Sequence, residues 1–176
     1  MKTNESGRSM IEMLGVLAII GVLSIGGIAG YSKAMGKHRV NKTIDQITQI
    51  VSSTRSLFYG HKSYAALNDS TADLVKKGHL FPDELGTGEG TNPFGGHVRI
   101  SSTGSKNKAF SIEYTQIPEE ACIDLITQDW GSGARSGFVS INVGSSTFTS
   151  SPVSLINATS NAACNGQNNT ITWSFY

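Results

Sequence analysis

The chain has 176 residues, of which 38% are hydrophobic and 15% are charged, and its formal net charge is +1. This length leaves room for one globular domain of modest size behind an apolar N-terminal run. The sparse charge and the many Gly, Ser, Thr and Asn residues favour a β-rich extracellular domain over a cytosolic enzyme. The small net charge argues against nucleic acid as a partner.

The first predicted element is an apolar helix near the N-terminus. No charged side chain occurs from Met13 to Ser32, and a run of about 20 apolar residues is long enough to cross a bilayer as one helix. A secretory signal peptide is not expected, because the run is too long and residues 31–35 supply no small-residue cleavage site. We therefore expect this segment to remain in the mature protein.

Two signals disagree on the orientation of this helix. Basic side chains are more numerous behind the run than before it, and the positive-inside rule alone would keep the C-terminal part inside the cell. The composition of that part and its two cysteines indicate export, and we give them more weight. The basic residues are Lys2 and Arg8 before the run, and Lys33, Lys37, Arg39 and Lys42 after it.

An acid, Glu12, stands at the N-terminal edge of the run. A carboxylate there is costly unless it is paired, neutralised or held at the headgroup level. The sequence around it, Gly-Arg-Ser-Met-Ile-Glu-Met-Leu at residues 7–14 and Ala-Ile-Ile-Gly-Val-Leu at residues 18–23, resembles the N-terminus of type IV pilins and pseudopilins. The match covers about 25 residues, and in this family the segment is processed and then used for filament assembly.

The resemblance implies specific roles for three residues. In this family a prepilin peptidase cuts after a glycine, the new amino group is methylated, and a glutamate is the fifth residue of the mature chain. A cut between Gly7 and Arg8 would make residues 1–7 a leader and Glu12 the fifth mature residue. We expect Glu12 to pair with the free amine of Arg8 in a neighbouring subunit and so to fix the axial register. Arg8 stands where the family usually has an apolar residue.

Glycines are frequent in the apolar run. Gly21 falls where the family often has glycine, and Gly26 and Gly30 form a small-xxx-small pair that lets helices approach closely. Glycine lowers helix stability in water by about 1 kcal/mol relative to Ala, so we expect a soft point around Gly26 and Gly27 once the helix leaves lipid. The alternative is a generic membrane helix, in which glycine is common.

The helical pattern continues behind the run and becomes amphipathic. We expect one helix from near Ser9 to Tyr59, ended by Gly60, with residues 8–32 in the membrane or filament core and residues 33–59 packed on a head domain. The predicted buried stripe is Val40, Ile44, Ile47, Val51, Thr54 and Phe58.

The head is predicted to span residues 60–176 and to begin with a connecting region. A short helix from Thr71 to Lys77 is expected, capped by residues 68–70 and ended by Gly78. Residues 86–96 are rich in glycine, but they lack the Gly-Lys-Ser/Thr signature of a phosphate-binding loop. An ordinary loop is the better interpretation.

Alternating apolar and polar residues predict strands in the second half of the chain. A helix is expected to open at Pro118, and another over residues 153–163. The predicted fold class is α+β: a long N-terminal helix, membrane-spanning in its first half, packed on an antiparallel β-sheet head, as in pilins. The apolar strand positions are Val98 and Ile100; Phe110, Ile112 and Tyr114; Val139, Ile141 and Val143; and Ile171, Trp173 and Phe175.

The chain has two cysteines, Cys122 and Cys164. In an exported domain an oxidised pair is the default, whereas a cytosolic domain would keep two buried free thiols. We predict the bridge, because both cysteines lie in the half of the chain farthest from the apolar run. The enclosed region 122–164 resembles the disulfide-bounded region of the large-headed, type IVb-like pilins.

No catalytic or metal constellation stands out, and we predict neither an enzyme nor a cofactor. The four histidines are far apart without ligand spacing, and no Gly-x-Ser-x-Gly elbow occurs. Asp83, Glu84 and Glu89 suggest a weak calcium site such as some pseudopilins use, but solvated loop acids are the better interpretation.

The resemblance implies a structural subunit of a type IV pilus. The implied partners are further copies of the chain in a helical filament, the inner membrane before assembly, the prepilin peptidase and the pilus assembly machinery. The implied location is the inner membrane for the precursor and an extracellular pilus afterwards. Adhesion, motility, DNA uptake and conjugation use the same subunit plan. The alternatives are a type II secretion pseudopilin, a minor priming pilin, and a membrane-anchored binding module that never polymerises.

Overall fold

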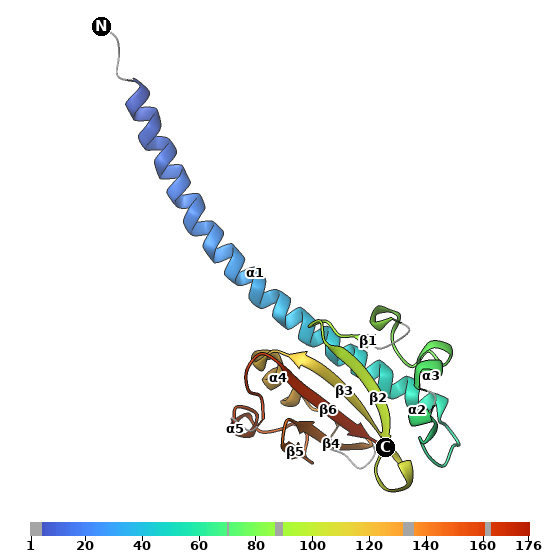
Figure 1. The fold of residues 1–176 in the computed structure, drawn as a ribbon. Helices are drawn as coiled ribbons and strands as arrows, with labels where there is room; N and C mark the ends of the chain where they lie inside the picture. Colours follow the sequence, from blue (N-terminus) through green and yellow to red (C-terminus); the bar gives the residue numbers. More distant parts are fainter. Residues whose placement is uncertain (1–4, 70, 87–89, 132–135, 161–162) are drawn as a thin grey trace. The chain divides into compact units, whose positions relative to one another are not determined.

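The computed structural model describes residues 5–69, 71–86, 90–131, 136–160 and 163–176, apart from the side chains of residues 5–9, 69, 71 and 72 (Figure 1). The chain divides into two compact units, residues 1–38 and residues 39–176. The first unit is helical wherever it is described. The second contains the rest of that helix and the whole sheet.

The long helix α1 runs from Glu5 to Leu57, 53 residues in one element, which confirms the predicted single helix. A last turn follows it, in which the Phe58 amide donates to the Thr54 carbonyl over 3.0 Å. Gly60 then adopts a positive φ of 84°, a conformation that glycine adopts without steric cost. The predicted stop at this glycine is therefore correct.

The buried face of α1 is rotated slightly from the predicted stripe. Half of the stripe is buried, namely Val40, Ile47 and Thr54, whereas Ile44, Val51 and Phe58 are only half-buried. Two polar residues, Thr43 and Gln46, and the apolar Ile50 complete the buried face. The prediction missed Thr43 and Gln46 because polar residues do not mark an apolar stripe.

Two short helices, α2 (Ala66–Asp69) and α3 (Thr71–Lys77), follow α1. The second has the predicted bounds, and it ends where the Gly78 amide donates to the Leu74 carbonyl. The predicted cap at residues 68–70 includes Ser70, which lies outside the described residues. Asn68 belongs to α2 and accepts a hydrogen bond from the Ser102 amide at 3.0 Å.

Within the described residues, six antiparallel strands form one sheet in the order β1-β2-β3-β6-β4-β5. The predicted α+β fold, an antiparallel sheet packed on the long helix, is confirmed. The prediction missed β1 and β5, which are too short for an alternating pattern to show. The strands are β1 (Gly90–Thr91), β2 (His97–Thr103), β3 (Ala109–Ile117), β4 (Phe138–Val143), β5 (Ser146–Phe148) and β6 (Asn169–Phe175).

The inner face of the sheet forms one core with α1. A row of paired residues crosses five strands there: Ile100, Ile112, Trp173, Ile141 and Phe148. In the next row, the ring of Tyr114 lies edge-on to Trp173 with centroids 5.8 Å apart. Tyr114 is fully buried, and burial raises the pKa of its hydroxyl far above the usual range.

The outer face of the same sheet is polar and almost uncharged. One row consists of four serines on four neighbouring strands: Ser101, Ser111, Ser174 and Ser140. The next row is Arg99, Glu113, Thr172, Asn142 and Thr147. Alternation between the two faces, interrupted by register shifts between Tyr114 and Ile117 and between Phe138 and Ser140, explains why most strand positions could be predicted.

The glycine-rich segment before β2 is organised by one asparagine. The Asn92 Oδ1 atom accepts hydrogen bonds from the Phe94 and Gly96 amides at 2.8 and 3.1 Å. A Cβ at Gly96 would lie 2.0 Å from the Thr115 carbonyl oxygen, so this position accommodates glycine alone. The described part of the segment is a loop plus β1, and the glycine at position 96 has a packing reason.

Arg55 joins the last turns of α1 to the end of β6. Its Nε atom donates to the Tyr176 main-chain oxygen at 2.8 Å, and its Nη2 atom donates to the Ser136 carbonyl at 2.7 Å. The guanidinium also lies 5.9 Å from the centre of the Phe175 ring. The sequence places Arg55 on an outward face of the helix, so these contacts were not expected.

Replacing Arg55 with Ala should lower the stability of the full chain in detergent micelles by about 2 kcal/mol, because two charge-assisted hydrogen bonds and a cation–π contact are lost. Thermal unfolding should shift down by roughly 4–8 °C. The matched control is Lys62→Ala, at an exposed position, which should leave the transition unchanged. Equal transitions for the two variants would contradict a structural role for Arg55.

Candidate functional site

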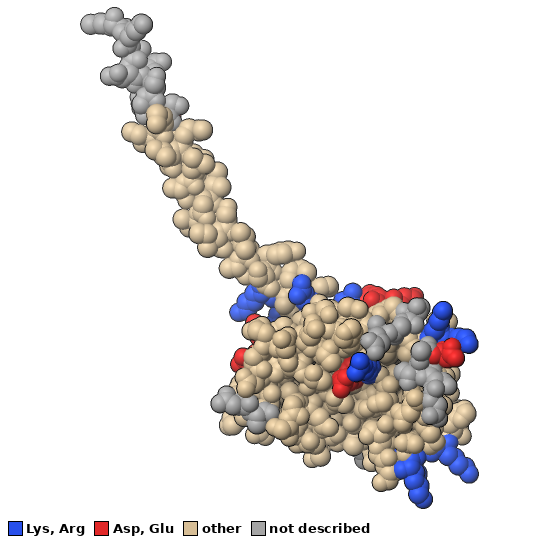
Figure 2. Space-filling view, in the orientation of Figure 1, with Lys and Arg blue, Asp and Glu red and all other residues tan. Residues whose placement is uncertain are grey.

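The first candidate site is the exposed apolar surface of α1. Its large apolar side chains from Met10 to Tyr31 are between 52% and 73% exposed. Among the described residues, α1 is the one helix that is long and apolar enough to cross a membrane. In the view of Figure 2, no acidic or basic side chain is visible on the described part of this helix before the blue basic side chains begin. An apolar surface of this size needs lipid or other protein to cover it.

The predicted processing and assembly residues lie at the N-terminal end of this surface. Gly7, Arg8 and Glu12 all belong to α1, and positions 8 and 12 are about one helical turn apart. The side chain of Arg8 is outside the described part of the structure. Glu12 is exposed, and apolar side chains surround it in sequence on both sides. The structure thus presents a carboxylate at the edge of an uncovered apolar helix.

The glycines of the run have no packing role within the chain. A Cβ added at Gly21, Gly26, Gly27 or Gly30 would meet nothing within 4 Å. The helix nevertheless continues through all four positions, at a cost of about 1 kcal/mol each relative to Ala in water. Any packing reason for these glycines must therefore lie outside the single chain, in a membrane or in an assembly.

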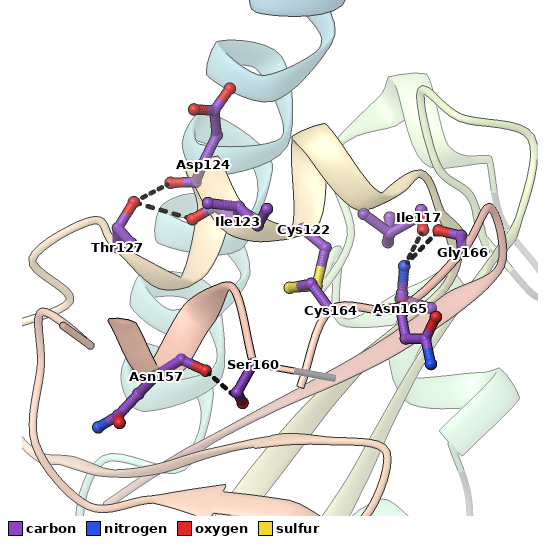
Figure 3. Close-up of a disulfide and its surroundings, with 11 residues drawn as sticks. Ile117, Cys122, Ile123, Asp124, Thr127, Asn157, Ser160, Cys164, Asn165 and Gly166 are labelled. Carbon is purple, nitrogen blue, oxygen red and sulfur yellow. Dashed lines mark hydrogen bonds between the residues drawn. A yellow bond between two sulfur atoms is a disulfide. The ribbon is translucent and has the colours of Figure 1, made fainter. Parts of the chain in front are cut away.

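The second candidate site is the disulfide-bounded region of the head, where Cys122 and Cys164 are joined with their Cα atoms 5.7 Å apart (Figure 3). Cys122 lies in α4 (Glu119–Ile126), which begins directly after Pro118 as predicted. The helix predicted over residues 153–163 is wrong in its length. Among the described residues of this stretch, α5 (Leu155–Ala158) alone is helical; it ends in hydrogen bonds such as that from Ser160 Oγ to the Asn157 carbonyl.

One asparagine, for which no role was predicted, connects the segments around the disulfide. Asn169 is 7% exposed, and its Nδ2 atom donates to the Ile117 and Gly166 carbonyls, both at 3.0 Å. Its Oδ1 atom accepts from the Asn165 amide at 2.8 Å. These bonds tie the start of β6 to the end of β3 and to the turn beside Cys164. An isolated asparagine before a strand gives no sequence signal for such a role.

Of the acids considered for a calcium site, Glu84 is paired with a lysine. Glu84 lies 2.8 Å from the Lys42 ammonium, and a hydrogen bond from that group lowers the pKa of Glu84 below its usual value. Glu89 is outside the described residues. Among the residues that the structure describes, no group of three or more His, Cys, Asp or Glu side chains is placed to hold a metal ion.

Comparison with known proteins identifies the head. The family model described as PilS N terminal matches residues 37–175. This match begins behind the apolar run, so it is independent of the resemblance at residues 7–14. Head and N-terminal signature therefore indicate the same class of protein separately.

Two relatives are similar in sequence. The major structural subunit of the bundle-forming pilus of Escherichia coli O127:H6 (strain E2348/69 / EPEC) is 29% identical over 146 residues, which cover 80% of this chain and 74% of the relative. The toxin coregulated pilin of Vibrio cholerae is 28% identical over 131 residues, which cover 72% of this chain and 58% of the relative.

A solved structure shares the fold. The crystal structure of TcpA, a type IV pilin from the El Tor biotype of Vibrio cholerae, superposes with a TM-score of 0.52 at 18% sequence identity. The match covers 79% of this chain and 99% of that structure. At this identity the likeness establishes the architecture of the head and no more.

Proposed function

This chain belongs to the type IV pilin family that the PilS model describes, and from that premise we propose that it polymerises through α1 into an extracellular filament. The observation that carries the proposal is the uncovered apolar surface from Met10 to Tyr31 on a helix whose later part is built into the head. In a filament, copies of that surface would bury one another. No catalytic role is proposed.

We further propose that processing creates the partner of Glu12. Cleavage between Gly7 and Arg8 removes the leader, residues 1–7, and frees an α-amine on Arg8, which is then methylated. Inside an apolar bundle this amine and the Glu12 carboxylate of a neighbouring subunit attract more strongly than at a surface, although desolvation offsets part of the gain. Wrong axial positions leave the carboxylate without the amine, so the pair selects one register.

The proposed route runs from the inner membrane to the cell exterior. Residues 8–32 would hold the precursor in the membrane and later form the filament core. Residues 33–59 would join that core to the head, residues 60–176. The Cys122–Cys164 disulfide supports export of the head, because such bonds form and persist in oxidising compartments. The proposed partners are further copies of the chain, a prepilin peptidase and the pilus assembly machinery.

The proposal is tested by locating the chain in cells that produce it together with the assembly machinery. Filaments sheared from the surface should contain this chain as their main component, and antibodies against the head should decorate them along their whole length in electron micrographs. If the chain stayed in the membrane fraction while filaments formed without it, a membrane-anchored binding module would be the better explanation.

A further inference from the structure

The turn between Cys164 and β6 contains an asparagine followed directly by a glycine, Asn165-Gly166 (Figure 3). No other asparagine in the sequence precedes a glycine. The amide nitrogen of the residue after an asparagine can attack the Cγ atom of that asparagine, and glycine hinders this attack least because it has no Cβ atom. The pair is therefore the place in the chain where a side-chain amide is lost most readily.

The structure leaves this pair accessible to water. Asn165 is exposed, Gly166 is half-buried, and neither residue belongs to a helix or a strand. Gly166 has a positive φ of 73°, and its amide donates no hydrogen bond to another described residue. The attacking nitrogen is thus not held by an acceptor that the reaction would first have to displace.

The buried side chain of Asn169 holds both ends of this pair. Its Oδ1 atom accepts a hydrogen bond from the Asn165 amide at 2.8 Å, and its Nδ2 atom donates to the Gly166 carbonyl at 3.0 Å. To reach the Asn165 Cγ atom, the Gly166 nitrogen must turn together with the peptide plane that joins the two residues. That rotation strains both hydrogen bonds, so Asn169 slows the attack. It does not prevent the attack, because each bond has a modest net strength.

We propose that Asn165 is a site of spontaneous deamidation in the folded head and that Asn169 sets its rate. Hydroxide removes the proton of the Gly166 amide, and the nitrogen forms a bond to the Asn165 Cγ atom. The Cγ–Nδ2 bond then breaks, Nδ2 takes a proton from water, and ammonia leaves behind a five-membered succinimide. Water opens this ring at Cγ to give an aspartate, or at the main-chain carbonyl carbon to give an isoaspartate. Overall, one water enters and one ammonia leaves, without oxidation or reduction.

Either product changes the turn beside Cys164. The new carboxylate brings a negative charge into the stretch from Ser136 to Tyr176, which contains no Asp, Glu, Lys, Arg or His. An isoaspartate also adds one carbon to the main chain between the two groups that Asn169 holds, so the present pair of hydrogen bonds no longer fits. The modification therefore weakens the connection between the disulfide and β6 as the protein ages.

The test incubates the full chain in detergent micelles at mildly alkaline pH and follows the chymotryptic peptide that contains Asn165 by mass spectrometry, relative to an unincubated sample. In the folded chain, Asn165 should exchange NH₂ for OH at a rate proportional to the hydroxide concentration. Asn168 is an internal control, because it is exposed in the same turn but precedes an asparagine; it should keep its amide. Asn165→Gln should abolish the conversion, because the longer side chain would have to form a six-membered ring.

Replacing Asn169 with Ala should accelerate the conversion at least about tenfold, the effect of releasing two hydrogen bonds. The matched control Asn168→Ala should leave the rate unchanged, and tryptophan fluorescence shows whether each variant is folded. Reduced wild-type chain in denaturant provides the unrestrained rate, which should also exceed the folded rate at least about tenfold. This comparison tests the restraint even where Asn169→Ala does not fold.

The proposal is overturned if Asn165 keeps its amide in the folded chain while the unfolded chain converts, or if Asn168 converts as fast as Asn165. Equal rates in folded and unfolded wild-type protein would also overturn it, as would a folded Asn169→Ala protein that reacts no faster than Asn168→Ala. None of these outcomes depends on whether filaments form.

Discussion

Replacing Glu12 with Ala is expected to reduce the amount of filament at least about a hundredfold, while the head still folds and its disulfide still forms. A charge left without its partner in an apolar interior costs about 3–5 kcal/mol, and in this variant the amine of Arg8 would be that charge at every subunit. Glu12→Gln keeps the side-chain size and should fail in the same way, since it lacks the charge. Sheared fractions quantified by immunoblot, with electron microscopy of the same samples, provide the measurement.

The control for this experiment is Glu119→Ala, which removes an exposed carboxylate at the start of α4 and should leave the filament yield unchanged. The total amount of chain in the membrane fraction should be the same for all variants. Filaments of normal yield and length from Glu12→Ala would contradict the role of Glu12 in register and leave the apolar surface alone to explain assembly.

Replacing both Cys122 and Cys164 with Ala should lower the free energy of unfolding of the head by about 4 kcal/mol, because the open loop regains conformational entropy in the unfolded chain. The bridge closes a loop with a sequence separation of 42. Since domains are stable by only about 5–15 kcal/mol, this loss should strongly reduce the amount of folded protein. Denaturant unfolding of the full chain in micelles, followed by tryptophan fluorescence, measures it.

Reduced wild-type protein is the matched control for this variant, because it lacks the bridge but keeps both sulfur atoms in the core. Both cysteines are buried, at 0% and 3% exposed, so any extra loss in the double variant reports the small cavities left by the sulfurs. A difference below about 1 kcal/mol between oxidised and reduced wild-type protein would show that the bridge is not a main source of stability.

The architecture could be predicted because its signals are local. The uncharged run from Met13 to Ser32 and the alternation in β3, β4 and β6 each lie within one continuous stretch of sequence. The elements that were missed or misjudged are those set by tertiary contacts. Strands of two or three residues, such as β1 and β5, exist because their neighbours offer hydrogen-bonding edges, and no pattern of their own marks them.

The candidate sites likewise include residues that a local sequence signal marks and residues whose roles are set by tertiary contacts. The N-terminal signature identified a family to which the head, matched over residues 37–175, independently belongs. Arg55 was beyond prediction, because its partner Tyr176 is 121 residues away. The alternation of polar and apolar residues in a strand predicts which face each residue occupies, but it does not predict which residues from other elements lie beside it.

The central claim is tested most directly by the intact mass of the chain recovered from sheared filaments, with fragmentation of its N-terminal peptide. We predict a chain that lacks residues 1–7 and begins at Arg8 with one methyl group on its α-amine. A filament-derived chain that still begins at Met1 would contradict the proposed cleavage between Gly7 and Arg8, and with it the pairing of that amine with Glu12.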